Sequence, residues 1–226
     1  MPISNIPRVP VTVSEYELAE RCARGRVVVI DDDAEILSAF SALLELSEYA
    51  CETYSSAIDY LQVLQSNRAC FAGPCCVLCD VNMSELNGLE LQRQLAKLGD
   101  TPVLLMSGVC GVFEVIKAFR AGALDFLIKP IDADQLLEAV QKALAISSQR
   151  QELRQRRTRS AERLASLTER EREITQRVVR GQTNQAIAIE LGIALRTVKL
   201  YRQRAMKKIG AETIADFIRI VDAGNL

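Results

Sequence analysis

Residues 77–82 have the sequence VLCDVN, in which a short apolar run leads to a single carboxylate, Asp80. A polar turn follows, and then a pattern of helical spacing that begins at Gly88. An apolar run of strand length before a helix is typical of a buried parallel strand. In open α/β sheets, ligands bind at the edge where such strands end. Asp80 is therefore predicted to lie at a binding edge.

Other strand-like runs also end in polar groups, which we expect at the same edge. These groups are the carboxylates of Asp31 and Asp32, the hydroxyl of Ser107 and the ammonium group of Lys129. The three carboxylates would form a hard-oxygen site suited to Mg²⁺, which removes the repulsion between them. With the ion bound, Asp80 can attack a phosphoryl group while Ser107 and Lys129 stabilise its oxygens, which gives an aspartyl phosphate. Asp33 is predicted instead to cap the next helix.

Residues 26–146 alternate between strand-like and helix-like patterns. The apolar runs predict strands at residues 27–30, 50–53, 75–80, 102–107 and 124–128. Apolar residues at helical spacing follow each of them, at residues 36–46, 55–65, 88–98, 111–121 and 132–146. Five strands alternating with five helices predict an α/β fold, a doubly wound five-stranded parallel sheet with right-handed connections.

The second part of the chain differs from the first in charge. Residues 1–149 carry 11 basic and 20 acidic side chains, whereas residues 150–226 carry 17 basic and 9 acidic ones. This asymmetry favours an acidic domain joined to a nucleic-acid-binding domain. A solvated basic surface without a partner is the alternative. Residues 147–165 contain no Gly or Pro, which predicts a helical linker that extends the preceding helix.

Four short helices are predicted after the linker, at residues 169–180, 184–191, 195–209 and 212–222. Thr168 and Glu171 predict a capping box at the first of them. The tight junction at Gly192 is typical of a helix-turn-helix. The outer face of the third helix is predicted to carry three cations and an amide: Arg196, Lys199, Gln203 and Lys207. Such a face fits the major groove of DNA, although a merely solvated helix face is the simpler alternative.

Seven cysteines suggest a rival hypothesis, a thiolate-bound metal or iron–sulfur sensor built from Cys70, Cys75, Cys76 and Cys79. Strand alternation argues against it, since Cys75 and Cys79 would point to one face of the sheet and Cys76 to the other. Buried, reduced thiols are the favoured interpretation. The N-terminus lacks the apolar core of a signal peptide, and no apolar run reaches about 18 residues, so we expect a cytoplasmic protein that does not enter a membrane.

Residues 26–146 resemble the receiver domain of two-component response regulators, which has a flavodoxin-like fold. The matching residues lie at the ends of the predicted strands, except Phe126, which lies within the fifth strand: Asp31–Asp32, Asp80, Ser107–Gly108, Phe126 and Lys129–Pro130. The resemblance implies that a sensor histidine kinase transfers a phosphoryl group to Asp80. It implies the Mg²⁺ ligands Asp31, Asp32, Asp80 and the backbone carbonyl of Asn82. It also implies that Ser107, Lys129 and Phe126 sense the phosphate, with the aromatic ring rotating inward as the hydroxyl moves.

The last 60 residues or so resemble the LuxR/NarL-type helix-turn-helix. The resemblance rests on LTERE at residues 167–171, Gly181, Asn184, IA at 187–188, LG at 191–192 and RTVK at 196–199. By position in that family, the base-reading residues are Lys199, Leu200 and Gln203. The phosphate-binding residues are Thr183, Asn184, Thr197, Arg202 and Lys207. The family usually has Ser-Pro where Ala194 and Leu195 stand, so this helix is expected to be capped differently.

These resemblances imply a transcriptional response regulator of the NarL/FixJ type, not an enzyme. Phosphorylation of Asp80 would promote a homodimer and sequence-specific binding to double-stranded DNA. The expected parts are an N-terminal extension (1–25), a receiver domain (26–146), a helical linker (147–166) and an all-α helix-turn-helix domain (167–226). A receiver that regulates DNA binding without phosphorylation is the alternative, besides the cysteine-based sensor.

Overall fold

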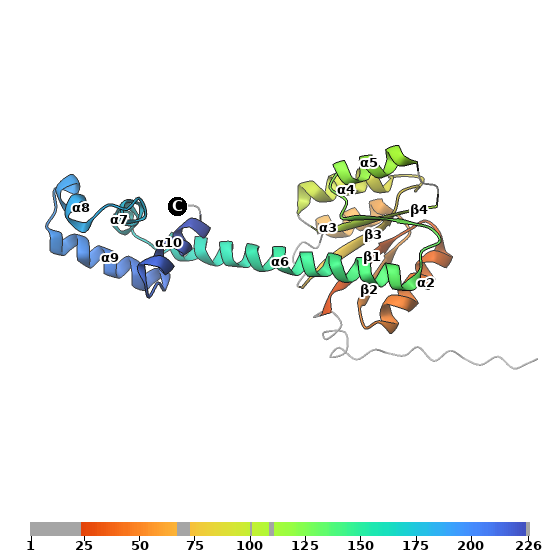
Figure 1. The fold of residues 1–226 in the computed structure, drawn as a ribbon, viewed down its shortest axis with the longest axis horizontal. Coiled ribbons are helices and arrows are strands. Elements are labelled where there is room, and N and C mark those ends of the chain that lie inside the picture. Colours follow the sequence, from red (N-terminus) through yellow and green to blue (C-terminus); the bar gives the residue numbers. More distant parts are fainter. Residues whose placement is uncertain (1–23, 67–72, 100, 109–110, 225–226) are drawn as a thin grey trace, which may run out of the picture. The chain divides into compact units, whose positions relative to one another are not determined.

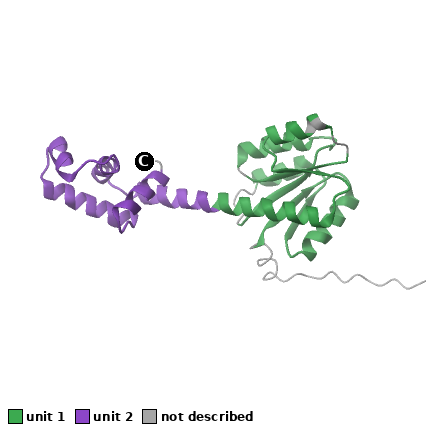
Figure 2. Cartoon of the chain, viewed as in Figure 1, with its two compact units in different colours: residues 1–151 green, residues 152–226 purple. Residues whose placement is uncertain are grey.

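A computed structural model describes the chain over residues 24–66, 73–99, 101–108 and 111–224. The chain divides into two compact units, residues 1–151 and residues 152–226 (Figure 2). The predicted N-terminal extension lies outside the described residues as far as residue 23. The linker is helical, because α6 (Ala133–Ala165) continues without a break from the first unit into the second.

The first unit is built on a five-stranded parallel sheet with the order β2-β1-β3-β4-β5 (Figure 1). The strands are β1 (Arg26–Ile30), β2 (Ala50–Tyr54), β3 (Cys75–Asp80), β4 (Val103–Ser107) and β5 (Asp125–Ile128). From β1 the chain continues to β2 at one edge of the sheet, whereas from β3 it continues to β4 and β5 toward the opposite edge. The strand order therefore reverses between β1 and β3. Ile30 lies opposite Cys79. The residue after β1 and the last residue of β3 therefore meet at this switch point, where such sheets bind ligands.

Helices cover both faces of the sheet (Figure 1). They are α2 (Ala34–Leu46), α3 (Ala57–Ser66), α4 (Gly88–Leu98), α5 (Val112–Arg120) and the first part of α6. One core packs Val28, Val77 and Leu105 of the sheet against α3, α4 and α5. A second core packs the alternate strand residues, such as Val27 and Leu78, against α2 and α6. The three central strands β1, β3 and β4 are buried on both faces, which explains their continuous apolar sequences. The parallel sheet with helices on both faces confirms the predicted fold class.

The second unit consists of the end of α6 and four further helices. These are α7 (Glu169–Val179), α8 (Asn184–Leu191), α9 (Leu195–Ile209) and α10 (Ile214–Ala223). Their core includes Leu164 of α6, Ile174 of α7, Ile187 of α8 and Phe217 of α10. Among the described residues, no helix combines the length and apolar character needed to cross a membrane.

Capping residues set several helix boundaries. The predicted cap at Asp33 is confirmed, since its Oδ1 accepts a hydrogen bond from the Glu35 amide at 2.8 Å. The capping box of Thr168 and Glu171 is also present. Two helices begin two residues later than predicted because a capping hydroxyl precedes each of them. Ser56 accepts from the Ile58 amide at 3.1 Å, and Thr213 accepts from the Asp216 amide at 3.1 Å.

The cysteines follow the strand alternation predicted for them. Cys75 and Cys79 belong to the core on one face of the sheet, and Cys76 to the core on the other. Burial raises the pKa of the Cys75 thiol to about 12, so the thiol form is favoured at neutral pH. Cys70 lies outside the described residues. Within the described ranges, no three side chains of His, Cys, Asp or Glu lie together as a metal site would require.

Candidate functional site

Two buried carboxylates and one lysine meet at the carboxyl edge of the sheet. Asp31 follows β1, Asp80 ends β3 and Lys129 follows β5. The Lys129 Nζ lies 2.6 Å from Asp31 Oδ2 and 2.6 Å from Asp80 Oδ1. Asp31 is 1% exposed and Asp80 is 5% exposed. A lysine bound to both carboxylates lowers their mutual repulsion and holds them at the switch point.

Burial and ion pairing act in opposite directions on these groups. Burial raises the pKa of the Asp31 carboxyl, although the hydrogen bond and charge of Lys129 act against this rise. Burial alone would lower the pKa of Lys129, but hydrogen bonds to Asp31 and Asp80, together with their charges, raise it above its usual value. Lys129 is therefore fully protonated at neutral pH and can act as a fixed positive charge.

Asn82 connects Asp80 to Ser107. Its backbone amide donates to Asp80 Oδ2 at 2.6 Å, and its side-chain Nδ2 donates to Ser107 Oγ at 3.1 Å. Ser107 ends β4 and is fully buried. The sequence predicted a role for the Asn82 carbonyl but missed its side chain. The available signal in the sequence was an amide side chain two residues after Asp80.

Asp32 lies apart from the buried pair. It is exposed and lines a groove of about 370 Å³ together with Ser56, Met83 and Glu85. The buried site itself has two negative charges against the one positive charge of Lys129. Carboxylate oxygens with excess negative charge are ligands that suit Mg²⁺. Asp31 and Asp80 are therefore donors that suit the ion, but Asp32 does not join them. The three-carboxylate cluster expected from the sequence is not assembled in the described part of the chain.

Gly88 is a further site residue that the sequence did not reveal. It is the first residue of α4, and its amide donates to the Val81 carbonyl at 3.1 Å. A Cβ at Gly88 would collide with the backbone carbonyl oxygen of Asp80. Only glycine lets α4 approach the end of β3 this closely, so Gly88 fixes the backbone of Asp80.

Phe126 lies in β5, opposite Leu105 of β4. Its ring is partly buried and packs against the core that α3, α4 and α5 cover. Its strand, β5, ends just before Lys129 and is separated from β3 by β4. The rotation predicted for this ring is a proposal taken up below.

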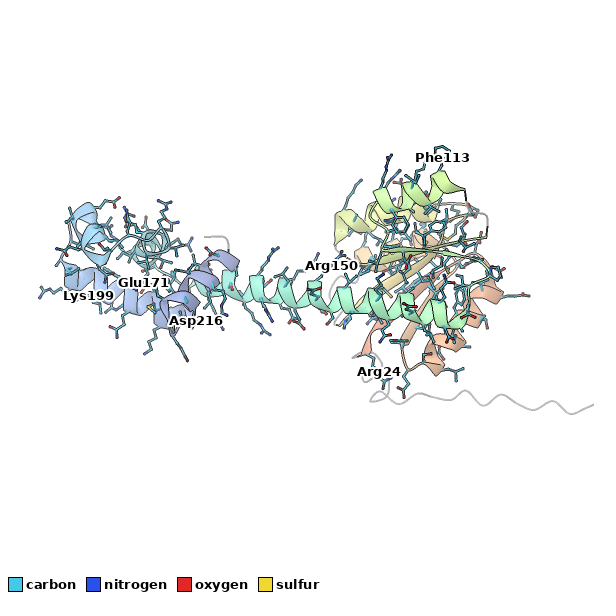
Figure 3. All side chains as sticks on the ribbon, viewed as in Figure 1. Arg24, Phe113, Arg150, Glu171, Lys199 and Asp216 are labelled. Atoms are coloured by element: carbon cyan, nitrogen blue, oxygen red, sulfur yellow. The ribbon has the colours of Figure 1, made fainter. Side chains whose placement is uncertain are left out.

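The predicted DNA-binding residues gather on α8 and α9. Val198, Ala205 and Ile209 are buried on the inner side of α9. The predicted outer face is exposed, comprising Arg196, Lys199, Gln203 and Lys207, and Figure 3 shows Lys199 on the outside of this helix. Leu200 is 44% exposed. The left-handed conformation of Gly192 makes the turn between α8 and α9.

Neighbouring polar residues support this face. Thr183 caps α8 by accepting from the Ala186 amide at 3.2 Å. Arg202 Nη1 donates to Asn184 Oδ1 at 3.0 Å, which ties α9 to the start of α8. Thr197 is partly buried, and no side chain caps α9 at Ala194, as the departure from the family pattern predicted. A groove of about 400 Å³ lies along the face and is lined by Asn184, Lys199, Arg202, Gln203, Met206, Lys207 and Ala211.

Comparison with known proteins identifies the family of each part of the chain. Residues 27–141 match the response regulator receiver domain, and residues 165–221 match the luxR family of bacterial regulatory proteins. The transcriptional regulatory protein FixJ of Azorhizobium caulinodans is 34% identical over 196 residues, which cover 86% of this chain and 90% of FixJ. The chain belongs to the NarL/FixJ family of response regulators.

Two further relatives of this response regulator cover most of its length. The response regulator protein TodT of Pseudomonas putida is 34% identical over 197 residues, 87% of this chain and 85% of TodT. The solved structure of response regulator StyR is 30% identical, covers 88% of this chain and 98% of StyR, and has a TM-score of 0.76. The response regulator thus has a receiver domain, which implies a sensor kinase as partner, and a LuxR-type domain, which implies DNA binding. It is a regulator of transcription, a class whose members are generally not enzymes.

Proposed function

We propose that Asp80 of this response regulator accepts a phosphoryl group from a sensor histidine kinase. The position of the Lys129 Nζ, 2.6 Å from both Asp31 and Asp80, carries the proposal. A protonated amine beside the acceptor carboxylate can move onto the oxygens of an incoming phosphoryl group.

Asp31, Asp32, Asp80 and the backbone carbonyl of Asn82 would hold Mg²⁺. The bound ion would supply charge that neutralises the phosphoryl oxygens. An oxygen of Asp80 forms a bond to phosphorus while the bond between phosphorus and the histidine nitrogen of the kinase breaks, and the electron pair stays on that nitrogen. Lys129 then exchanges its contact with Asp80 for one with a phosphoryl oxygen. The product is an aspartyl phosphate.

The Ser107 hydroxyl would report the phosphate to the rest of the receiver domain. Its oxygen now accepts from Asn82. A phosphoryl oxygen on Asp80 would attract the hydroxyl proton in a charge-assisted hydrogen bond, which is stronger than a neutral one. As Ser107 moves, the partly buried ring of Phe126 turns further inward. Phosphorylation thereby shifts the population between two arrangements of this side of the sheet.

The phosphorylated arrangement favours a homodimer that binds double-stranded DNA. Two copies of α9 would enter major grooves at half-sites about one helical turn apart, or a multiple of it. Lys199, Leu200 and Gln203 would read bases, and Arg196 would lie on the same DNA-binding face. Thr183, Asn184, Thr197, Arg202 and Lys207 would hold phosphates. Such a protein would act in the cytoplasm, where the DNA is.

The experiment that tests the acceptor is phosphorylation by a small phosphodonor, with and without Mg²⁺, followed by intact mass measurement. We expect a gain of about 80 Da in the wild type, the mass of one phosphoryl group, and no gain in Asp80→Asn. Asp222→Asn, a change of the same chemistry at an exposed position of α10, is the matched control and should gain the mass. A wild type that gains no mass would indicate the alternative, a receiver controlled without phosphate.

A further inference from the structure

The end of α6 is a basic segment that belongs to the DNA-binding unit. Residues 152–165 contain five arginines and two glutamates, a net charge of +3. Ser160 and Leu164 of this segment are buried. A Cβ at Gly224, just after α10, would meet the Leu164 side chain and the Ser160 backbone, so the two helices are in close contact there. This packing fixes which face of α6 stays exposed.

Arg163 joins the exposed face of α6 to the end of α9. Its Nη1 donates to the Ile209 carbonyl at 3.3 Å, at the last residue of α9. The same nitrogen lies 3.8 Å from the point that a Cβ at Gly210 would occupy. The outer face of α9 runs through Lys199, Gln203 and Lys207, and residue 210 is the next position at helical spacing. Arg163 therefore continues the basic face beyond the end of α9.

Arg159 and Arg156 extend this face along α6. They precede Arg163 by four and seven residues, a spacing that places all three on one side of a helix. Both are exposed. The only ion pair seen for Arg156 among the described residues joins it to Glu152 at 3.7 Å, with both side chains more than 60% exposed. Such a pair contributes little and leaves the guanidinium available.

We propose that Arg156, Arg159 and Arg163 form a second DNA-binding surface that contacts the phosphate backbone flanking the site read by α9. The inference rests on the proposed DNA binding by α9. Seven residues of helix span about 10 Å, close to the axial length of three base pairs, so the three arginines can follow one strand beside the recognised bases. Guanidinium groups bind phosphate in a bidentate manner and need no base sequence. The surface would add affinity without adding specificity.

The test compares two double variants of the full-length protein. Arg156→Gln with Arg159→Gln removes two charges from the proposed surface. Arg154→Gln with Arg157→Gln removes two charges from the same helix, at the same spacing, on another side. The probe is a duplex selected from a random pool by the wild-type protein, in a long form and in a form trimmed to the selected site. Binding is measured between 50 and 300 mM salt.

We expect the first double variant to reduce the slope of log K against log salt by up to about 1.8, which is about 0.9 for each lost phosphate contact. The control variant should keep the wild-type slope. On the trimmed duplex, the two double variants should have the same slope. Equal slopes in both variants, or no change in either, would overturn the proposal. A wild type that binds no duplex at all would instead contradict the proposed function itself.

Discussion

Lys129 holds one positive charge between two buried carboxylates, so the site has one uncompensated negative charge. Leaving a charge buried without a partner is costly, which favours a bound cation. An incoming phosphoryl group would add more negative charge to the same place. We therefore expect Lys129 and a divalent ion to act together, because neither alone balances the charge of the phosphorylated site.

Replacing Ser107 should separate phosphorylation from its consequences. Ser107→Ala keeps the Asp80, Asp31 and Lys129 groups, so the protein should still gain the mass of one phosphoryl group. It lacks the hydroxyl that would follow the phosphate, so the gain in DNA affinity on phosphorylation should fall about tenfold, or about 1.4 kcal/mol. The measurement is DNA affinity with and without phosphorylation. Ser107→Thr retains the hydroxyl and is the control that should keep the gain. A full gain in Ser107→Ala would exclude Ser107 as the sensor.

Some residues of the site could be predicted from the sequence, and others could not. Asp31, Asp80 and Lys129 could be predicted because each follows an apolar run, and parallel strands bring their ends to one edge. The bond from Asn82 to Ser107 joins positions 25 residues apart and depends on the distance between two strand ends, which no sequence spacing contains. The need for glycine at position 88 could not be predicted either, because it arises from the close approach of α4 to the Asp80 backbone.

At the scale of the helix, Glu171 ties α7 to α9. It completes the capping box with Thr168, and Lys208 of α9 donates to its Oε2 at 2.6 Å. Burial raises the pKa of Glu171, but the hydrogen bonds from Lys208 and Thr168 outweigh burial and leave the pKa below its usual value. The carboxylate form is thus favoured by folding, and one side chain stabilises both a helix end and a contact between helices.

The lowered pKa of Glu171 predicts a stability that depends on pH. Its contribution is present above the pKa of the unfolded chain, about 4.3, and is lost as the pH falls through the lower pKa of the folded state. Glu171→Gln should reduce the free energy of unfolding of the second unit by about 1 kcal/mol at pH 7. The difference from wild type should shrink as the pH falls below about 4.3 and through the lower pKa of the folded state, because Glu171 then takes up a proton and becomes neutral, like Gln. Urea unfolding at pH 7 and pH 3 measures this difference.

Glu173→Gln is the matched control for this experiment. Glu173 pairs with Arg170 and Arg177 on the surface of α7, and its side chain is 30% exposed. Surface pairs contribute about 0–1 kcal/mol, so this variant should lose less than Glu171→Gln at pH 7. An equal loss in the two variants, or a loss in Glu171→Gln that stays constant down to pH 3, would contradict the role given to the capping box.

The residues along α9 should differ in what they contribute to DNA binding. Lys207→Gln should weaken binding to all duplexes alike and reduce the salt slope by about 0.9, since it removes one phosphate contact. Gln203→Ala should instead relax the preference at one base pair, at a cost of about 1–3 kcal/mol for the selected site. Salt titrations on selected and scrambled duplexes give both quantities. An unchanged salt slope in Lys207→Gln would count against this division.

Helices were predicted well where the sequence contains their start and stop signals. The boundaries of α4, α8 and α9 agree with the prediction, because Asn87, Gly192 and Gly210 mark ends that depend only on local conformation. The continuity of α6 followed from the lack of Gly and Pro. The packing of its last turns on α10 did not follow, since it depends on how Leu164 and Gly224 meet in space.

At the level of the whole molecule, Asp80, the proposed acceptor, and the proposed DNA-binding face lie in different compact units that share the helix α6. A signal between them must therefore act on an equilibrium that both sites influence. The charges of the units differ in sign, with the acidic side chains concentrated before residue 150 and the basic ones after it. DNA thus attracts one unit, and the kinase meets the other.

This coupling predicts that phosphorylation and DNA binding favour the same assembly. With beryllium fluoride as phosphate mimic, the wild type should shift from monomer to dimer and bind a duplex with paired half-sites at least tenfold more tightly, a coupling of about 1.4 kcal/mol or more. Asp80→Asn should show neither change. Sedimentation velocity measures the assembly, and a titration of the same duplex measures the affinity.

Because coupling free energies are reciprocal, the duplex must also raise the affinity for beryllium fluoride by the same factor that the mimic raises the affinity for the duplex. A duplex with one half-site is the control, since it cannot favour a dimer and should raise the affinity for the mimic much less. If the wild type stays a monomer and binds the duplex equally with and without the mimic, DNA binding is independent of phosphate. The receiver unit would then have to control transcription through another partner.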